Sequence, residues 1–264
     1  MSPIVRLALD EDIGTGDITS EACVPESQQA RGRFVAREPL VVAGLEILSE
    51  LYPSLTLEKH NGDVCRGGEI IAETAGPARL LLERERVALN FLQRLSGVAT
   101  LARRFADAVA GTDCKVLDTR KTTPGLRALE KAAAAAGGIA NHRMGLFDAV
   151  LIKNNHIAAA GGVRNAIQRA RATGRAIEIE VRTRAELLEA LDCGAPHLLL
   201  DNLTPAEAAE WIREIAGRAR VELSGGITLA NVRAYAETGA DFLSAGEITH
   251  SARAMDISFR LELA

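Results

Sequence analysis

The chain has 264 residues, 47% of them hydrophobic and 25% charged, so it can bury a full core as one large barrel or two ordinary domains. Its net charge of −4 argues against a nucleic-acid partner, which requires a basic surface, and no apolar run approaches the length that spans a membrane. The sequence has no secretory leader pattern, and its four cysteines (Cys23, Cys65, Cys114 and Cys193) are too widely spaced for a zinc site, so we expect reduced thiols in a cytoplasmic protein.

The N-terminal part of the chain differs in pattern from the rest. Three β-type runs, separated by glycines, lie at residues 33–36, 40–43 and 69–72. Residues 78–95 are then predicted to form a helix, because Leu81, Ala88 and Leu92 fall on one face at helical spacing. A second helix is predicted for residues 99–110.

From residue 115 onward, strand-like and helix-like runs alternate. The strand-like runs lie at residues 115–119, 149–153, 176–181, 197–201, 221–224 and 242–245. The helix-like runs lie at residues 126–136, 163–173, 184–193, 205–216 and 229–238. This alternation is typical of parallel β/α units and favours an eight-fold barrel, with a doubly wound open sheet as the alternative. Residues 251–264 end in an alternating pattern that suits an edge strand or a short amphipathic tail.

Each predicted strand of this second part ends in a polar or flexible group. The carboxyl ends of parallel strands share one rim, where ligands bind, so these groups are expected to converge on one site. The basic members are Arg120, Lys121, His142, Arg143 and Lys153. Crowded cations repel one another without an anionic partner, and Lys153 directly follows an apolar strand. The set therefore predicts a site for a polyanionic small molecule.

Two further kinds of residue stand at the same strand ends. The small residues Ser224, Gly225, Gly226, Ser244, Ala245 and Gly246 follow the last two strands. Small side chains let backbone N–H groups approach a phosphate, and late barrel loops are a common phosphate site. Glu180 and Asp201 place carboxylates among the cations, where they could bind Mg²⁺ or ribose hydroxyls, or form an internal ion pair.

Several segments resemble the quinolinate phosphoribosyltransferase family. The most specific are DTRKTTPGLR at residues 118–127 and NHRMGL at residues 141–146. Shorter matches lie at residues 11–19, 85–90, 95–100, 200–202 and 224–227, so the likeness covers nearly the whole chain. One departure is Asn154, where the family commonly has an acidic residue.

The resemblance implies an α/β protein with two domains. These would be an N-terminal α/β sandwich (residues 1–108, rejoined by 251–264) and an incomplete (β/α) barrel (residues 109–250). It also implies a homodimer, in which Arg86 enters the neighbouring subunit's site. The activity would be phosphoribosyl transfer from phosphoribosyl pyrophosphate to quinolinate with decarboxylation, in NAD biosynthesis, with Mg²⁺ as cofactor.

The resemblance also implies roles for individual residues. Arg120, His142, Arg143 and Lys153 would hold the two quinolinate carboxylates, in a substrate site that includes Thr119. Lys121 and Lys153 would face the diphosphate, with His250 beside them, and Glu180 and Asp201 would hold ribose hydroxyls and Mg²⁺. The catalytic set is therefore Lys121, Lys153, Glu180 and Asp201. The small residues of the last two strands, 224–226 and 244–246, would surround the 5′-phosphate.

Three other functions are considered. A related enzyme could use a monoacid such as nicotinate without decarboxylation, but Arg120 and Arg143 together favour a dianion. A Schiff-base aldolase could use Lys153 as its nucleophile, but such a lysine needs an apolar pocket to stay neutral. A non-catalytic phosphosugar sensor would account for the phosphate loops and would leave Glu180 and Asp201 unexplained.

Overall fold

The computed structural model describes all 264 residues, which divide into two units. The first unit comprises residues 1–103, 123–138 and 252–264, and the second comprises residues 104–122 and 139–251. The main difference from the domain boundaries expected from the sequence lies at residues 123–138, which group with the first unit. No helix combines the length and the apolar character needed to cross a membrane.

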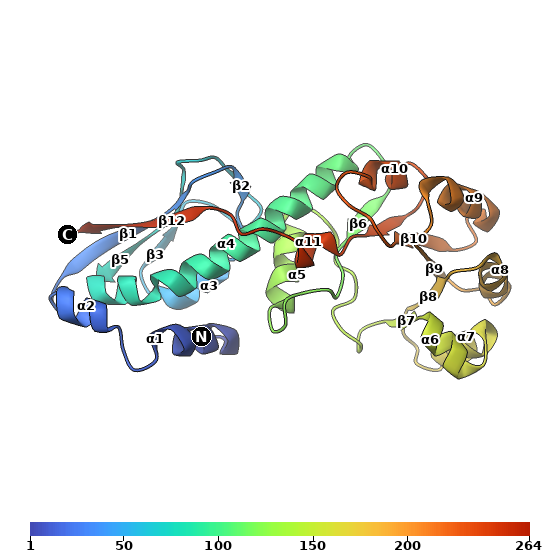
Figure 1. Cartoon of the computed structure of the whole chain (residues 1–264), viewed down its shortest axis with the longest axis horizontal. Helices are drawn as coiled ribbons and strands as arrows, with labels where there is room; N and C mark the ends of the chain where they lie inside the picture. Colours follow the sequence, from blue (N-terminus) through green and yellow to red (C-terminus); the bar gives the residue numbers. More distant parts are fainter. The chain divides into compact units, whose positions relative to one another are not determined.

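The first unit is built on a four-stranded antiparallel sheet in the order β12-β1-β5-β3 (Figure 1). The strands of this sheet are β1 (Gln29–Ala36), β3 (Leu55–Leu57), β5 (Ile70–Pro77) and β12 (Ile257–Leu263). Two further strands of the unit, β2 (Leu40–Val41) and β4 (Val64–Cys65), pair with each other. Its helices are α1 (Pro3–Ile13), α2 (Ile18–Cys23), α3 (Leu45–Leu51), α4 (Ala78–Ala108, which continues into the second unit) and α5 (Arg127–Ala136). The C-terminal segment thus supplies the edge strand β12, which pairs with β1 from Ala30↔Leu263 to Ala36↔Ile257.

Residues 78–108 form one continuous helix, α4, although the sequence pattern suggested two. The predicted break lies near Gly97, which is inside the helix. A Cβ atom at Gly97 would lie only 1.9 Å from the carbonyl oxygen of Arg253. The glycine therefore lets the C-terminal segment pass close to the helix. Glycine in a helix costs about 1 kcal/mol relative to alanine, and the packing of buried neighbours such as Leu95 and Val98 offsets that cost.

Helix α5 groups with the first unit because of a buried ion pair. Glu130 is fully buried, and its Oε1 lies 2.7 Å from Nη2 of Arg94 on α4. The backbone N–H and the hydroxyl of Thr123 also donate to this carboxylate. A buried carboxylate without such partners would be strongly destabilising. These contacts hold the segment 123–138 against α4, so it does not pack as the helix of a regular β/α repeat.

The second unit is a six-stranded parallel sheet in the order β6-β11-β10-β9-β8-β7 (Figure 1). Its strands are β6 (Lys115–Leu117), β7 (Val150–Ile152), β8 (Ile177–Val181), β9 (His197–Asp201), β10 (Arg220–Ser224) and β11 (Phe242–Ser244). Its helices are α6 (Asn154–Ala160), α7 (Val163–Arg171), α8 (Arg184–Asp192), α9 (Pro205–Ile215), α10 (Val232–Ala236) and α11 (Glu247–His250).

The strand order distinguishes the two architectures considered from the sequence. From β7 to β11 each strand pairs with the next one in the chain, so the winding never reverses, whereas a doubly wound sheet reverses at a switch point. β6 and β7 stand at the two ends of the sheet and do not pair, so the barrel is incomplete. The α/β class, with an N-terminal antiparallel sheet domain and a parallel α/β domain, is confirmed.

Two residues separate β8 from α8, and three separate β9 from α9. Thr183 and Glu186 form a capping box at the start of α8, and Thr204 and Glu207 form another at the start of α9. In each box the threonine hydroxyl accepts the N–H of the third helical residue, and the glutamate carboxylate accepts the backbone N–H of the threonine. The loops after β8 and β9 are therefore short, and they hold the residues at those strand ends close to the sheet.

Candidate active site

A cavity of about 780 Å³ opens at the carboxyl ends of the strands of the second unit. Most of the residues predicted from the sequence line it: Thr119, Arg120, Lys121, His142, Arg143, Lys153, Glu180, Asp201, Ser224, Gly225, Gly226, Ser244, Gly246 and His250. Two predicted residues do not line it. Ala245 is buried, and its N–H donates to the carbonyl of Leu117. Arg86 is exposed on α4, in the first unit.

Glu180 forms ion pairs with two cations of the cavity, through one carboxylate oxygen each. It is only 3% exposed, yet it lines the cavity from β8. Its Oε2 lies 3.0 Å from Nζ of Lys153, which follows β7, the neighbouring strand. Its Oε1 lies 2.7 Å from Nη2 of Arg182. A carboxylate this deeply buried is tolerated because both oxygens are paired with cations.

Arg182 links the two predicted metal ligands. Its Nη2 lies 2.7 Å from Oε1 of Glu180 and 3.3 Å from Oδ2 of Asp201. The two carboxylates therefore converge on one point, which a cationic nitrogen occupies. Carboxylate oxygens converging on a positive charge are the ligands that Mg²⁺ prefers, so this donor set fits the ion. The sequence analysis missed Arg182, although it directly follows the last residue of β8 and lies at the predicted rim.

A buried aspartate positions the loops that carry the cations. Asp118 is fully buried at the end of β6. Its Oδ1 accepts the backbone N–H of His142 at 2.9 Å, and its Oδ2 accepts the Asn141 side-chain amide at 2.6 Å. The same aspartate therefore ties the 118–121 loop to the segment that carries His142 and Arg143. Nearby, the hydroxyl of Thr119 accepts the N–H of Lys121 at 3.0 Å.

Arg120 lies close enough to Arg143 for its positive charge to affect the pKa of Arg143. Burial lowers the pKa of the Arg143 guanidinium, and the positive charge of Arg120 lowers it further. Nη1 of Arg143 donates to the carbonyl of Ala149 at 3.0 Å, which orients its side chain. Two partly buried guanidinium groups that repel each other across a cavity favour an anion between them.

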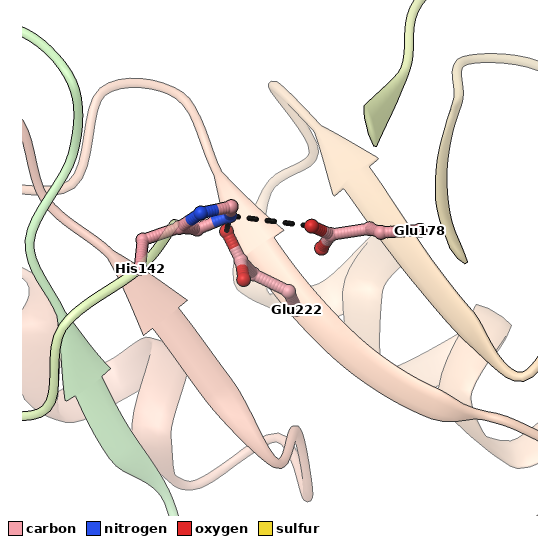
Figure 2. A group of neighbouring side chains, drawn as sticks. All are labelled: His142, Glu178 and Glu222. Atoms are coloured by element: carbon pink, nitrogen blue, oxygen red, sulfur yellow. Dashed lines mark ion pairs between the residues drawn. The ribbon is translucent and has the colours of Figure 1, made fainter. Parts of the chain in front are cut away.

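His142 forms a cluster with two glutamates that were not predicted from the sequence. His142, Glu178 and Glu222 each place one ring nitrogen or carboxylate oxygen within 4.8 Å of the others (Figure 2). Glu178 comes from β8 and Glu222 from β10, and they are 7% and 0% exposed. Glu178 could have been predicted from the sequence, because side chains two residues apart on a strand lie on the same face and Glu180 is a predicted site residue.

Gly225 shows how the loop after β10 is shaped. Its φ is +93°, in the left-handed region, and a Cβ atom there would lie 2.2 Å from Oδ1 of Asn202. Asn202 itself has a positive φ of 61°, and its side-chain amide donates to Asp201. Only glycine at position 225 can satisfy both the backbone angle and this close contact. The residues predicted to bind a phosphate therefore lie directly beside a predicted metal ligand.

The fold and the cavity define a class of protein. It is an α/β protein with an incomplete parallel barrel, whose strand ends gather arginine, lysine and carboxylate side chains around one cavity for a small anionic ligand. Residues 17–96 match the family described as "Quinolinate phosphoribosyl transferase, N-terminal domain", and residues 98–260 match "Quinolinate phosphoribosyl transferase, C-terminal domain". The chain therefore belongs to the quinolinate phosphoribosyltransferase family, and the resemblance seen in its sequence is confirmed.

Individual relatives agree with this assignment. The chain is 43% identical to a "Probable nicotinate-nucleotide pyrophosphorylase [carboxylating]" from Bacillus subtilis, over 96% of this chain and 90% of that protein. It is 39% identical to "Quinolinate phosphoribosyltransferase [decarboxylating] 1" of Nicotiana glauca, over 98% and 81% of the two chains. Among solved structures, NadC from Streptococcus pyogenes matches with a TM-score of 0.93 and 37% identity, over 100% of this chain and 99% of that one.

Proposed function

We propose that the protein transfers the phosphoribosyl group of phosphoribosyl pyrophosphate to quinolinate and decarboxylates the product, giving nicotinate mononucleotide, CO₂ and diphosphate for NAD biosynthesis. The observation that carries the proposal is that two guanidinium groups, those of Arg120 and Arg143, line the same cavity, where the charge of Arg120 lowers the pKa of Arg143. Quinolinate has two neighbouring carboxylates, and each can pair with one guanidinium. A monoacid such as nicotinate would offer one carboxylate to the two guanidinium groups, so the dianion fits better.

The residues around the cavity suggest how the two substrates are bound. Arg120 and Arg143 hold the carboxylates of the acid, His142 lines the cavity beside them, and Lys121 faces the diphosphate. Lys153 stands between the two sites. The loops at 224–226 and 244–246, with little side-chain bulk, receive the 5′-phosphate through their backbone N–H groups. Glu180 and Asp201 hold the ribose hydroxyls and Mg²⁺, and Arg182 must move away from them when the ion binds.

The chemistry then requires mainly positioning and charge stabilisation. The pyridine nitrogen attacks C1 of the ribose as diphosphate leaves, and Lys121 and Lys153 stabilise the charge on the leaving group. Bound Mg²⁺ would add Lewis-acid stabilisation of the same developing charge. Ribosylation gives the ring a positive charge, which stabilises the carbanion formed at C2 when CO₂ departs. No covalent intermediate on the protein is needed.

Two parts of the proposal concern the assembly and its location. Arg86 is exposed on α4, and the cavity is lined by the second unit alone. We therefore assign Arg86 to the site of a neighbouring subunit in a homodimer. All four cysteines are unpaired, as expected for a protein kept in the reducing cytoplasm.

The test supplies the protein with phosphoribosyl pyrophosphate, Mg²⁺ and one of three acids: quinolinate, nicotinate or pyridine-2-carboxylate. Nicotinate mononucleotide and CO₂ are expected from quinolinate, with kcat/KM for the two monoacids lower by at least about tenfold, because each leaves a charge-assisted pair unmade. Turnover of nicotinate at the rate of quinolinate would instead identify a non-decarboxylating relative.

A further inference from the structure

Glu178 and Glu222 place two buried carboxyl groups next to each other beside His142. They come from β8 and β10, and Figure 2 shows both directed toward the ring of His142. Glu178 is 7% exposed and Glu222 is fully buried. Two adjacent buried negative charges are strongly unfavourable, so one of these groups is expected to keep its proton at neutral pH.

The contacts of the two groups are unequal. Glu178 faces two histidines: its Oε2 lies 3.2 Å from Nε2 of His142, and its Oε1 lies 3.5 Å from Nε2 of His197, on β9. Glu222 has neither oxygen in a hydrogen bond of good geometry, and Nε2 of His142 is 3.6 Å from its Oε1. A carboxylate without donors is unstable when buried, whereas a neutral carboxylic acid is tolerated. These contacts assign the negative charge to Glu178 and the proton to Glu222.

The electrostatics of the pair agree with this assignment. Burial raises the pKa of Glu222 to about 8, and the negative charge of Glu178 contributes to the increase. Burial alone would also raise the pKa of Glu178, but the hydrogen bond from His142 and the charges of His197 and His142 bring it below its ordinary value. Burial lowers the pKa of His197. His142 and His197 are the titratable groups that face the pair, the charge of Arg143 acts on Glu178, and Ser244 on β11 is the polar neighbour of Glu222.

The ring of His142 is held in one orientation. Its Nδ1 accepts the backbone N–H of Arg143 at 2.7 Å, so in the neutral ring the proton is on Nε2, on the side of the two carboxyl groups. His142 therefore donates to Glu178, and this arrangement does not require a proton from Glu222. A metal ion bound by the three residues would need both carboxyl groups ionised, which the burial of Glu222 opposes.

Glu222 lines the same cavity as Arg120 and Arg143. An ionised Glu222 would repel the carboxylates of a bound aromatic acid, and a neutral one does not. A neutral carboxylic acid in this position is also a proton donor next to the substrate. The proposed reaction needs such a donor, because CO₂ leaves an electron pair on C2 of the ring and a proton must take its place.

We propose that Glu222 is the acid that protonates C2 of the ribosylated pyridine ring after CO₂ departs, and that Glu178 and His142 hold it in position. The inference rests on the function proposed above. The C2–carboxylate bond breaks and leaves its electron pair on C2, beside the positively charged ring nitrogen. The O–H bond of Glu222 then breaks as the C2–H bond forms. The resulting carboxylate regains a proton from water when the product leaves.

The experiment follows diphosphate release and nicotinate mononucleotide formation separately, in single-turnover reactions at saturating substrates and Mg²⁺. Glu222→Gln keeps the shape of the side chain and removes the acid. Diphosphate release is expected to stay within about threefold of wild type, whereas nicotinate mononucleotide formation should fall by about 10²- to 10⁴-fold, the usual contribution of a general acid. The unprotonated carbanion would also recapture CO₂, so added ¹³CO₂ should enter the C2 carboxylate in the variant.

Equal loss of both products in Glu222→Gln, or no loss of either, would overturn the assignment. Failure of wild type to make nicotinate mononucleotide from quinolinate would instead refute the proposed function itself. If Glu222→Gln does not fold, the pH dependence of wild type decides: nicotinate mononucleotide formation should decline as pH rises through about 8, with diphosphate release unchanged. Nicotinate mononucleotide formation that stays constant through that range would contradict the proposal.

Discussion

Nζ of Lys153 lies 3.0 Å from Oε2 of Glu180, so the cation that follows β7 is paired with a carboxylate of β8. Arg182 occupies the other oxygen of the same carboxylate. In this state of the protein, the two carboxylates assigned to Mg²⁺ are thus neutralised by side chains of the chain itself. Binding of the ion must compete with Arg182.

This competition leads to a prediction for Arg182→Ala. Removing the guanidinium frees Glu180 and Asp201, so the protein should bind Mg²⁺ more tightly, by about tenfold if one charge-assisted interaction is removed. Isothermal titration with Mg²⁺ in the absence of substrate measures this affinity directly. Arg184→Ala controls for the loss of one positive charge, because Arg184 is exposed and pairs with Glu214 between α8 and α9. Weaker Mg²⁺ binding in Arg182→Ala would mean that Arg182 does not compete for the same point.

The two basic residues assigned to different substrates should respond differently to removal. Arg143→Ala should raise KM for quinolinate by about 10- to 100-fold, since one charge-assisted pair with a carboxylate is worth about 1.5–3 kcal/mol. Lys121→Ala should also lower kcat, because the charge on the departing diphosphate grows in the transition state. Steady-state kinetics with each substrate varied separates these effects. Equal effects on KM alone in both variants would contradict the assigned roles.

Gly225→Ala tests the phosphate loop. The added Cβ would lie 2.2 Å from Oδ1 of Asn202, on a backbone with φ of +93°, so Asn202 and the loop must shift. We expect KM for phosphoribosyl pyrophosphate to rise by about tenfold or more, with KM for quinolinate nearly unchanged. Gly217→Ala is the matched control, because Gly217 also has a positive φ, of 74°, with nothing within 4 Å of its added Cβ. An equal rise in both variants would reflect backbone strain alone.

The raised pKa of Glu222 predicts how stability depends on pH. The folded protein keeps the proton up to about pH 8, while the unfolded chain releases it near the ordinary value of 4.5. Between these values the unfolded state binds fewer protons, so this group lowers the free energy of unfolding as pH rises. Glu222→Gln lacks this dependence. Its Tm relative to wild type should therefore increase by a few degrees between about pH 5 and about pH 8.

The comparison between wild type and Glu222→Gln isolates this group. Glu178 has a lowered pKa, so its contribution is lost only in acid, as pH falls through its folded value, outside the window used. His197 is common to both proteins and largely cancels in the difference. A constant difference in Tm from about pH 5 to about pH 8 would show that Glu222 is ionised in the folded protein, and this result would also remove the basis for its role as an acid.

Much of the site was predictable because parallel strands place their carboxyl ends on one rim. Lys153, Glu180 and Asp201 could be assigned to that rim from the end of each strand-like run, and all three line the cavity. Arg182 follows the same rule but was not singled out, since it lies between the strand-like run 176–181 and the helix-like run 184–193. Near Gly97 the sequence pattern predicted a helix break that is not present. A glycine in a helical pattern suggests a break, and only the packing of Arg253 against it explains why the helix continues.

The amino-acid sequence by itself determined the alternation of strands and helices, the family and the cationic rim, because these depend on local periodicity and on residues close in the chain. Only the tertiary structure decided three things. It grouped α5 with the first unit through the buried pair of Arg94 and Glu130. It brought Arg182 between Glu180 and Asp201. It also placed Glu178 of β8 and Glu222 of β10, which lie far apart in the chain, around His142. The protonation of such a pair depends on burial and on through-space charge, neither of which a local pattern contains.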